Sequence, residues 1–340
     1  MKKINPLVVL AAFLFAATLL IPAFLVMPFK GGWSGGKLSE NVPQTPSQTT
    51  TADSGVEVAV YRSAKSKVEK IPLEDYLVGV VASEMPADFA EEALKAQALT
   101  ARTYIVKQML SKEGHSGLPV GAQVGDTQMD QVYKDKDELK RIWGSDYSWK
   151  IKKIVEAVRA TGGQILTYHG EPITATFFST SNGYTENSED YWPSSLPYLR
   201  SVASPWDKNS PMFSRQTVIP VQDFEAKLGV RLTGDPTIGK IIERTAGKRI
   251  GKVDFNGKIL TGKTIREKLN LNSSDFTMER QGGNIIIHTK GYGHGVGMSQ
   301  YGANGMAAEG KTYQDIVKHY YKGVEIASAE NMLATITAKR

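Results

Sequence analysis

The sequence predicts an α+β fold, with mixed helices and short strands around one groove and a single N-terminal transmembrane helix before them. Three observations favour this class. Residues 7–29 carry no charge, residues 56–61 alternate as a half-buried strand does, and apolar residues between 73 and 81 recur at helical spacing. Later segments mix both patterns, and no internal repeat is present.

The composition is that of a folded protein without disulfides or a concentrated surface charge. The 340 residues are 41% hydrophobic and 22% charged, enough for one large core or two smaller ones. The absence of Cys excludes structural disulfides and thiolate ligands. Lys2, Lys3 and Lys30 contribute half of the formal charge of +6. No block of like charges follows, which argues against a nucleic-acid partner.

The apolar N-terminal segment predicts a membrane anchor. As a helix, residues 7–29 span about 34 Å, enough for a hydrocarbon core of roughly 30 Å. A cleaved signal peptide is the competing interpretation, because Lys2 and Lys3 precede the apolar run. The run is long for a signal core, however, and the sequence has no Ala-x-Ala site before the next polar stretch. We therefore expect an uncleaved anchor.

The rest of the domain organisation follows from this anchor. Lys2 and Lys3 place residues 1–6 in the cytoplasm, because cationic flanks favour that side of the membrane. Residues 30–55 are rich in Gly, Ser, Thr, Pro and Gln and predict a flexible linker. Residues 56–340 then form one extracytoplasmic domain, and the chain is a single-pass protein of the cell membrane.

Two consecutive helices are expected near the start of this domain. The first has an apolar face that ends at Met85-Pro86 and consists of Leu73, Tyr76, Leu77, Val80 and Val81. The second opens at Asp88, with Glu91 in a capping-box position, and runs to about Leu110. Its many alanines permit close packing against neighbouring elements.

The other expected elements are shorter. Helices are predicted at residues 139–143, 150–160, 299–309 and 313–321, the last with Thr312 as its N-cap. Strands are predicted at residues 164–168, 173–179, 217–220, 248–255 and 284–289.

Glu84 is a carboxylate that continues the apolar face of the first predicted helix. Eleven residues at about 100° each bring it to within about 20° of the direction of Leu73, so its side chain points toward the interior. A helix C-terminus and partial burial both raise the pKa of a carboxyl group, which suits a general acid. The alternative is a structural ion pair with Lys95 or Arg102, and the spacing alone leaves both interpretations open.

The glycine-rich residues 291–302, GYGHGVGMSQYG, form the most unusual local sequence. Alternating glycines let the backbone approach a ligand closely, and they place His294 on a loop before a helix N-terminus. The spacing matches neither a phosphate-binding nor a dinucleotide-binding loop. The open interpretations of His294 are a sugar-contacting residue, a structural histidine and a metal ligand, although no other His stands at a ligand spacing.

A hydroxyl-rich turn in the middle of the chain predicts a carbohydrate-binding surface. Residues 177–187, FFSTSNGYTEN, contain Ser179 and Ser181. The aromatic residues that follow are Trp192, Tyr198 and Trp206. An ordinary strand end with core aromatics is the alternative. A serine nucleophile has no support here, because the sequence offers no G-x-S-x-G elbow.

Three segments together resemble the stage II sporulation protein D family of lytic transglycosylases. They are VASEMPADFAEEALKAQALTARTY, FFSTSNGYTENSEDYWPSSLPYLRSV and GYGHGVGMSQYGANGMAAEGKTYQDIVKHYY. The resemblance covers most of residues 56–326. It favours the catalytic interpretation of Glu84 over the ion pair.

The resemblance implies one catalytic groove that cuts peptidoglycan glycan after N-acetylmuramic acid, on strands already stripped of stem peptides, and leaves an anhydro sugar. Glu84 corresponds to the catalytic acid. The residues carried over as substrate-binding are Lys95, Arg102, Ser179, Ser181, Tyr198 and His294. One carboxyl group suffices if the sugar's own hydroxyl attacks. A hydrolase needs a second carboxylate, for which Glu186 and Asp190 are the candidates.

The resemblance also implies partners. It implies a complex with a cell-wall amidase and a membrane protein of the engulfment machinery, between the mother cell and the forespore of a sporulating cell. Some family members resemble zinc proteins that use His and Cys after the second helix. Residues 121–133 of this chain contain no Cys, so we predict neither a metal nor another cofactor. The alternative function is a non-catalytic wall-binding module that enhances a partner amidase.

Overall fold

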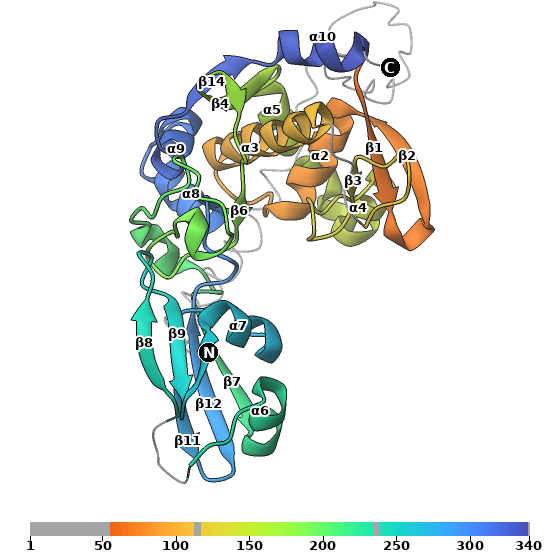
Figure 1. Cartoon of the computed structure of the whole chain (residues 1–340). Helices are drawn as coiled ribbons and strands as arrows, with labels where there is room; N and C mark the ends of the chain where they lie inside the picture. Colours follow the sequence, from red (N-terminus) through yellow and green to blue (C-terminus); the bar gives the residue numbers. More distant parts are fainter. Residues whose placement is uncertain (1–54, 112–116, 234–237, 339–340) are drawn as a thin grey trace, which may run out of the picture. The chain divides into compact units, whose positions relative to one another are not determined.

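Buried apolar side chains gather into two separate clusters, which define two lobes of an α+β fold (Figure 1). The computed structural model describes residues 55–111, 117–233 and 238–338, all within one compact unit. We call residues 214–290 the inserted lobe and the other described residues the main lobe. The mixture of helices and strands is as the sequence predicts.

The predicted cytoplasmic N-terminus, the anchor at residues 7–29 and nearly all of the linker lie outside the described residues. Within residues 55–111, 117–233 and 238–338, no helix is long and apolar enough to cross a membrane.

The main lobe begins with a hairpin and the helix that ends at Glu84. β1 (Glu57–Arg62) pairs antiparallel with β2 (Lys67–Pro72) and parallel with the short β3 (Val124–Gly125). α2 (Leu73–Glu84) follows directly, and the five apolar residues of its predicted face are each at most 1% exposed. Met85 is extended and ends the helix, as the following Pro86 favours.

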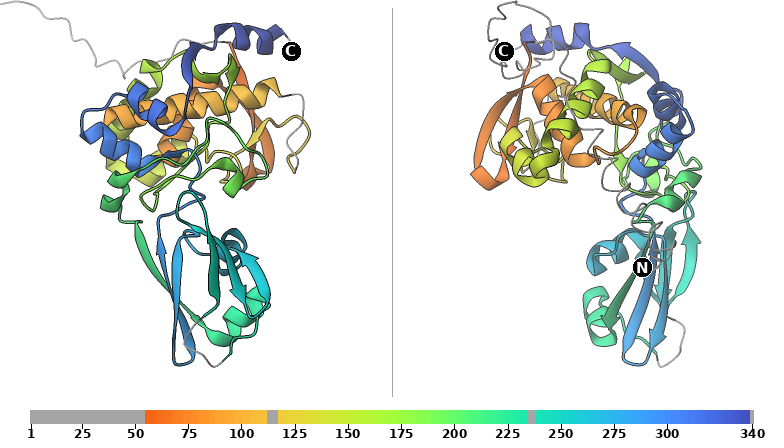
Figure 2. Two further views of the ribbon diagram at one scale, coloured as in Figure 1. Left: turned by 60° about the vertical axis from the view of Figure 1, so that its left-hand side comes forward. Right: turned by 180° about the vertical axis from the view of Figure 1, so that it is seen from behind.

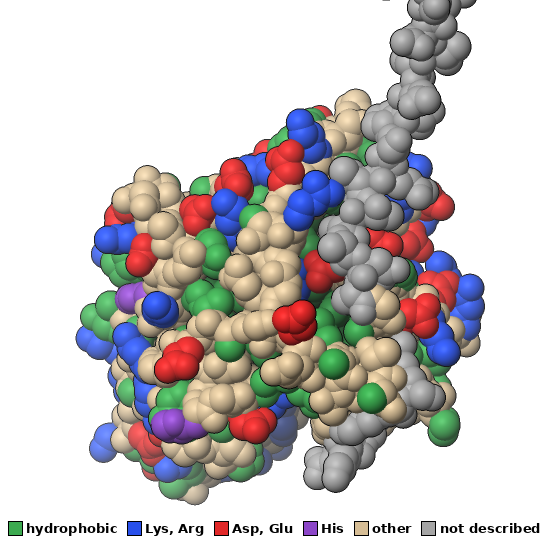
Figure 3. All heavy atoms as spheres, turned by 90° about the horizontal axis from the view of Figure 1, so that it is seen from above, with side chains coloured by type: hydrophobic (Ala, Val, Ile, Leu, Met, Phe, Trp, Pro, Cys, Tyr) green, Lys and Arg blue, Asp and Glu red, His purple; other side chains and the backbone are tan. Residues whose placement is uncertain are grey.

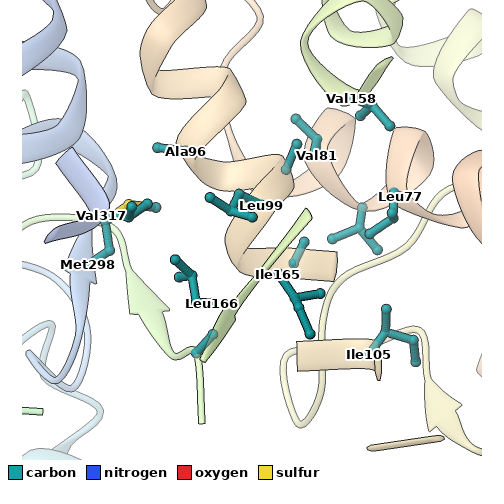
Figure 4. Packing of buried hydrophobic residues seen from close by; sticks show 14 of the residues in the cluster. Leu77, Val81, Ala96, Leu99, Ile105, Val158, Ile165, Leu166, Met298 and Val317 are labelled. Atoms are coloured by element: carbon teal, nitrogen blue, oxygen red, sulfur yellow. The ribbon is translucent and has the colours of Figure 1, made fainter. Parts of the chain in front are cut away.

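α3 (Glu91–Leu110) is the central helix of the main lobe and packs against α2 and α5 (Tyr147–Ala160). Its buried alanines let the neighbouring elements approach its axis closely. Leu77, Leu99 and Val158 come from these three helices and belong to one core (Figure 4). The core therefore fixes the direction of α2, and with it the position of Glu84.

Shorter elements complete the main lobe. The small sheets contain β4 (Gln164–Tyr168) between β5 (Glu171–Pro172) and β14 (Glu325–Ser328), and β6 (Phe177–Phe178) parallel to β13 (Met298–Ser299). The remaining helices are α4 (Lys136–Trp143), α8 (Gln300–Ala308), α9 (Tyr313–Tyr320) and α10 (Glu330–Ala338). Thr312 caps α9 through its side chain, as predicted.

The inserted lobe has its own core of two three-stranded antiparallel sheets and two helices. The sheets have the orders β11–β12–β7 and β10–β9–β8. The elements are β7 (Ser214–Pro220), α6 (Val221–Leu228), β8 (Lys240–Arg244), β9 (Ile250–Phe255), β10 (Lys258–Thr261), α7 (Gly262–Leu269), β11 (Phe276–Gln281) and β12 (Asn284–Lys290). β7 and β12 pair along their whole length, so the chain enters and leaves the lobe at neighbouring positions (Figure 2).

The predicted start of the second helix is wrong. Asp88 does not cap it, because residues 86–89 form a turn in which the Phe89 N–H donates to the Pro86 carbonyl at 3.0 Å. α3 begins only at Glu91, and its N-cap makes no side-chain hydrogen bond. The turn separates the two helices by a short, rigid connection directly after Glu84.

The predicted strand at residues 173–179 is also shorter than expected. The Thr174 N–H donates to the Tyr198 hydroxyl at 3.0 Å, and the Thr176 carbonyl accepts from the Tyr321 hydroxyl at 2.7 Å. Tyrosine hydroxyls thus satisfy backbone groups that a neighbouring strand would otherwise bind. Only β6 remains a strand.

One face of the molecule, drawn in Figure 3, carries both positive and negative side chains. Lys and Arg side chains are interspersed with Asp and Glu on the face in Figure 3. Such an arrangement gives this face no concentrated field for a polyanion.

Gly79 lets residues 133 and 134 lie close against α2, near Glu84. An added Cβ there would collide with the Tyr133 ring and lie 2.6 Å from the Lys134 carbonyl oxygen. We expect Gly79→Ala to lower the free energy of unfolding by about 1–3 kcal/mol through overpacking, although Ala favours a helix. Urea unfolding measures this.

The control for this substitution is Gly283→Ala, because a Cβ at Gly283 meets no atom within 4 Å. Equal losses of stability at Gly79 and Gly283 would contradict the close approach as the cause.

Candidate active site

A cleft of about 1090 Å³ has Glu84 in its lining. The main lobe contributes the end of α2, residues 128–132 with Lys134, part of α4, the region of β6 and the glycine-rich loop. α7 of the inserted lobe contributes Arg266 and Glu267. Elements distant in the sequence therefore line one cleft together with the Glu84 carboxyl group.

Glu84 is held through both its side chain and its backbone. Its Oε1 accepts the Val132 N–H at 2.6 Å. The Gln300 side chain donates from Nε2 to the Glu84 carbonyl at 2.9 Å and so satisfies one of the free carbonyls at the end of α2. One carboxylate oxygen is thus anchored by the protein, and neither contact supplies a charge.

Burial raises the pKa of Glu84 to about 7, against the opposing effect of the Val132 hydrogen bond. Within the described residues, no Lys or Arg forms an ion pair with Glu84. The alternative of a structural pair with Lys95 or Arg102 is therefore wrong. A carboxyl group with this pKa is largely protonated in mildly acidic solution and can both donate and accept a proton near neutrality.

Residues 124–135, which we call the bracing segment, carry the Val132 N–H to Glu84. β3 ties its start to β1. The buried Arg62 donates from Nε to Asp126 at 3.1 Å and from Nη1 to Asp135 at 3.3 Å, near the two ends of the segment. Between them, the Tyr104 hydroxyl donates to Asp130 at 2.8 Å. One guanidinium and one phenol therefore fix the loop that orients the acid.

An aromatic wall faces the same cleft. The His294 ring lies 5.3 Å from Trp192, 5.6 Å from Tyr191 and 5.7 Å from Phe178, measured between ring centroids. The Lys263 ammonium lies 4.4 Å from the Tyr191 ring centroid, a cation–π distance. Flat aromatic side chains of this kind can stack on sugar rings, so the wall is a candidate sugar subsite.

His294 is a neutral side chain in this wall. Burial, with help from the charges of Arg266 and Arg249, lowers the pKa of His294 to about 3. Its Nδ1 accepts the Val296 N–H at 3.0 Å, which leaves the ring proton on Nε2. The ring also hydrogen-bonds to the Phe177 backbone, so both ring nitrogens have partners in the protein and His294 carries no charge for substrate binding.

Ser179 lies in the cleft lining, whereas Ser181 and Tyr198 do not. Ser181 is fully buried and donates from Oγ to Asp207 at 2.8 Å. Tyr198 is 6% exposed and supports residues 173–176 as described above. Of these three residues, only Ser179 is in a position to contact a ligand in the cleft. Ser181 hydrogen-bonds to a carboxylate and not to a histidine, so it lacks the base that a serine nucleophile needs.

Lys95 and Arg102 also lie outside the cleft lining. Lys95 pairs with Glu91 at 2.7 Å and Glu92 at 2.9 Å on the first turns of α3. The fully buried Arg102 pairs with Glu74 at 2.8 Å and donates to two backbone carbonyls at the end of α5. These contacts join α2, α3 and α5, so Arg102 is a structural side chain.

The second carboxylate expected for a hydrolase is not supplied by Glu186 or Asp190, because neither lines the cleft. Glu186 is 2% exposed and pairs with Arg249 at 3.0 Å. Asp130 does line the cleft, and its two oxygens accept from Tyr104 and from the Gly125 N–H.

The structure provides no arrangement suited to a metal ion within its described residues. No group of three or more His, Cys, Asp or Glu side chains is placed to hold one there. The absence of a metal remains a prediction from the sequence.

The sequence analysis missed several residues that line the cleft or hold its lining in place. They are Arg62, Tyr104, Val132, Tyr191, Arg266 and Gln300. Gln300 stands inside the glycine-rich motif, and Tyr191 is next to a Trp in the quoted segment, so both had a local signal. Arg62 and the Val132 N–H act through contacts across 64 and 48 residues of sequence, for which no local pattern exists.

Comparison with known proteins assigns the chain to a family. A family model described as "Stage II sporulation protein" matches residues 61–168. The chain is 52% identical to stage II sporulation protein D of Bacillus amyloliquefaciens over 344 residues, which cover 99% of this chain and 100% of that protein. The same identity holds for the protein of that name in Bacillus subtilis (strain 168) over 334 residues, with 96% and 97% covered. The chain belongs to the stage II sporulation protein D family, so the predicted resemblance is confirmed.

A more distant relative has a different name. The chain is 31% identical to the amidase enhancer of Bacillus subtilis (strain 168) over 309 residues, which cover 74% of this chain and 40% of that protein.

The raised pKa of Glu84 predicts a pH-dependent effect on stability. The folded-state pKa of about 7 exceeds the ordinary value of 4.5, so the stability that protonated Glu84 contributes is present below about pH 4.5 and is lost as pH rises through 7. Glu84→Gln cannot ionise. Between pH 4.5 and 8 we expect its unfolding free energy to rise by roughly 1–3 kcal/mol relative to the native protein. Urea unfolding across pH measures the difference.

Glu267→Gln removes an exposed carboxylate from the same cleft and is the control for Glu84→Gln. A pH trend of equal size in Glu267→Gln would contradict burial as the cause.

Arg102 and Glu74 form a buried ion pair, so we expect a large decrease in the free energy of unfolding when one partner is removed. Arg102→Met leaves Glu74 without its counter-charge, and we expect a cost of about 3–5 kcal/mol. Changing both Arg102 and Glu74 to Met should restore part of the lost unfolding free energy, because no charge then stays buried. Lys95→Met, which breaks only a helix-surface pair, should cost less than about 1 kcal/mol. Chemical unfolding of the four proteins tests this, and a smaller loss for Arg102→Met than for Lys95→Met would refute it.

Proposed function

We propose that this chain is a peptidoglycan lytic transglycosylase whose single catalytic acid is Glu84. The observation that carries the proposal is a carboxyl group with a pKa of about 7 in the lining of a cleft with an aromatic wall. Membership of the stage II sporulation protein D family supports a role in sporulation. The substrate is a glycan strand stripped of stem peptides, cut after N-acetylmuramic acid.

The reaction needs one proton donor that then becomes the base. Protonated Glu84 gives its proton to the glycosidic oxygen as the bond from that oxygen to the anomeric carbon breaks. The Glu84 carboxylate then takes the proton from the 6-hydroxyl of the same muramic acid, whose oxygen bonds to the anomeric carbon. The products are an anhydro-muramic end and a free sugar hydroxyl, and Glu84 is protonated again. No water enters the bond-making step.

The site supports each step. The Val132 N–H holds one Glu84 oxygen and leaves the other for the sugar. The hydrogen bond also stabilises the carboxylate that forms when the proton leaves. Both oxygens of Asp130 accept hydrogen bonds from the protein, and the proposal assigns no proton transfer to Asp130 or to the exposed Glu267 of the same lining.

The proposed setting is the cell membrane of a sporulating cell. Residues 7–29 anchor the chain, and the catalytic domain acts outside the cytoplasm, between the mother cell and the forespore. A cell-wall amidase and a membrane protein of the engulfment machinery are the proposed partners. The amidase would produce the peptide-stripped strands on which Glu84 acts.

A wall-binding module is the second candidate function. Its support is the amidase enhancer relative, at 31% identity. In that case the aromatic wall holds glycan and Glu84 performs no proton transfer.

Digestion of peptide-stripped strands, with products resolved by mass, tests the proposal. We expect anhydro ends from the native protein and a loss of at least about a hundredfold in rate for Glu84→Gln, because the acid is removed. Since Glu84 must be protonated to act, kcat/KM should fall about tenfold for each pH unit above 7. Glu309→Gln removes an exposed glutamate directly after α8, outside the cleft, and is the charge-matched control.

The other outcomes of this digestion separate the alternatives. Intact strands with retained binding would leave the wall-binding module as the function. Reducing ends in place of anhydro ends would indicate a hydrolase and contradict the transglycosylase mechanism.

A further inference from the structure

Arg266 brings a positive charge from the inserted lobe to the cleft of the main lobe. It lies on α7 and lines the same cleft as Glu84 and His294. Its Nη1 donates to the Tyr191 hydroxyl at 3.2 Å, so the guanidinium is next to the aromatic wall. Its charge helps to lower the pKa of His294, which agrees with this position.

The Arg266 guanidinium differs from the buried arginines of the fold. Arg62, Arg102 and Arg249 each form an ion pair with a carboxylate. Arg266 forms no ion pair within the described residues, and its buried Nε has no hydrogen-bond acceptor there. Unpaired buried donors cost free energy, and a guanidinium without a counter-charge at a cleft wall can bind an anion.

The proposed substrate offers one anion for each disaccharide. N-acetylmuramic acid carries a lactyl group, whose carboxyl is bound as a neutral amide when a stem peptide is attached. Removal of the peptide leaves a free carboxylate at the same position. A guanidinium binds a carboxylate through charge-assisted hydrogen bonds and gains no such bond from an amide, which is bulkier and uncharged.

We propose that Arg266 forms a subsite for the free lactyl carboxylate of a muramic acid residue, and that this subsite makes the cleft select peptide-stripped strands. The inference rests on the proposed glycan substrate, but not on Glu84 acting as a catalyst. The alternative explanation is that Arg266 only holds Tyr191 in place. That role would affect charged and neutral strands equally, so the two are separable.

Binding of end-labelled strands to the full chain in detergent micelles tests the subsite without requiring cleavage. Glu84→Gln is present in every protein so that strands stay intact. One ligand is the stripped strand, and the other is the same strand with its lactyl carboxylates converted to methylamides. We expect the first to bind roughly ten- to a hundredfold more tightly, the usual effect of a charge-assisted hydrogen bond.

Arg266→Gln should abolish this preference by weakening the binding of stripped strands alone, and Arg266→Lys should retain part of it. Lys263→Gln is the matched control, because it removes the same charge from the same helix and also contacts Tyr191. Lys134→Gln removes the other lysine or arginine of the described cleft lining. Both controls should keep the preference.

Three results would overturn the subsite. They are equal binding of the two strands by the native Arg266, equal weakening of both strands in Arg266→Gln, and loss of the preference in Lys263→Gln or Lys134→Gln. Failure of the catalytic proposal gives a different result, namely a preserved preference in a protein that, with Glu84 restored, cuts no strand.

Discussion

The hydrogen bond from the Val132 N–H to Glu84 is the contact around which the cleft is organised. It joins the end of α2 to the bracing segment, and it forms only because Gly79 lets residues 133 and 134 lie against the helix. A neutral donor in place of Lys or Arg leaves burial as the main influence on the pKa of Glu84. Had α2 ended beside a cation, the same carboxyl would be a permanent anion near neutral pH.

The bracing segment is held in place mainly by ion pairs and hydrogen bonds. Arg62 has four carboxylates around it, from Glu69, Asp126, Asp135 and Glu138, and its guanidinium lies 4.8 Å from the centroid of the Tyr133 ring. A single residue of β1 therefore holds a loop that approaches the end of α2. The same stretch lacks the Cys ligands that the family resemblance associates with zinc, and here hydrogen bonds hold it.

Local sequence patterns predicted the helices better than the partners of their side chains. The apolar face of α2 identified both its direction and the inward position of Glu84, because a period of 3.6 residues decides them. The lobe at residues 214–290 was not foreseen, since its strands have ordinary patterns and its separate core depends on long-range pairing. Ser181, Tyr198, Lys95 and Arg102 were chosen by resemblance, and the structure uses them for internal contacts that residue type alone cannot reveal.

The pairing of β7 with β12 brings Ser214 opposite Lys290, so the chain enters and leaves the inserted lobe through two adjacent backbones. A segment joined in this way can be shortened or exchanged without rethreading the rest of the chain. Side-chain contacts such as the buried pair of Arg249 and Glu186 also tie the lobe to the main lobe, so a change that preserves the cleft must keep them. The inserted lobe is thus a part of the fold that evolution can lengthen or shorten while the core around α3 keeps its packing.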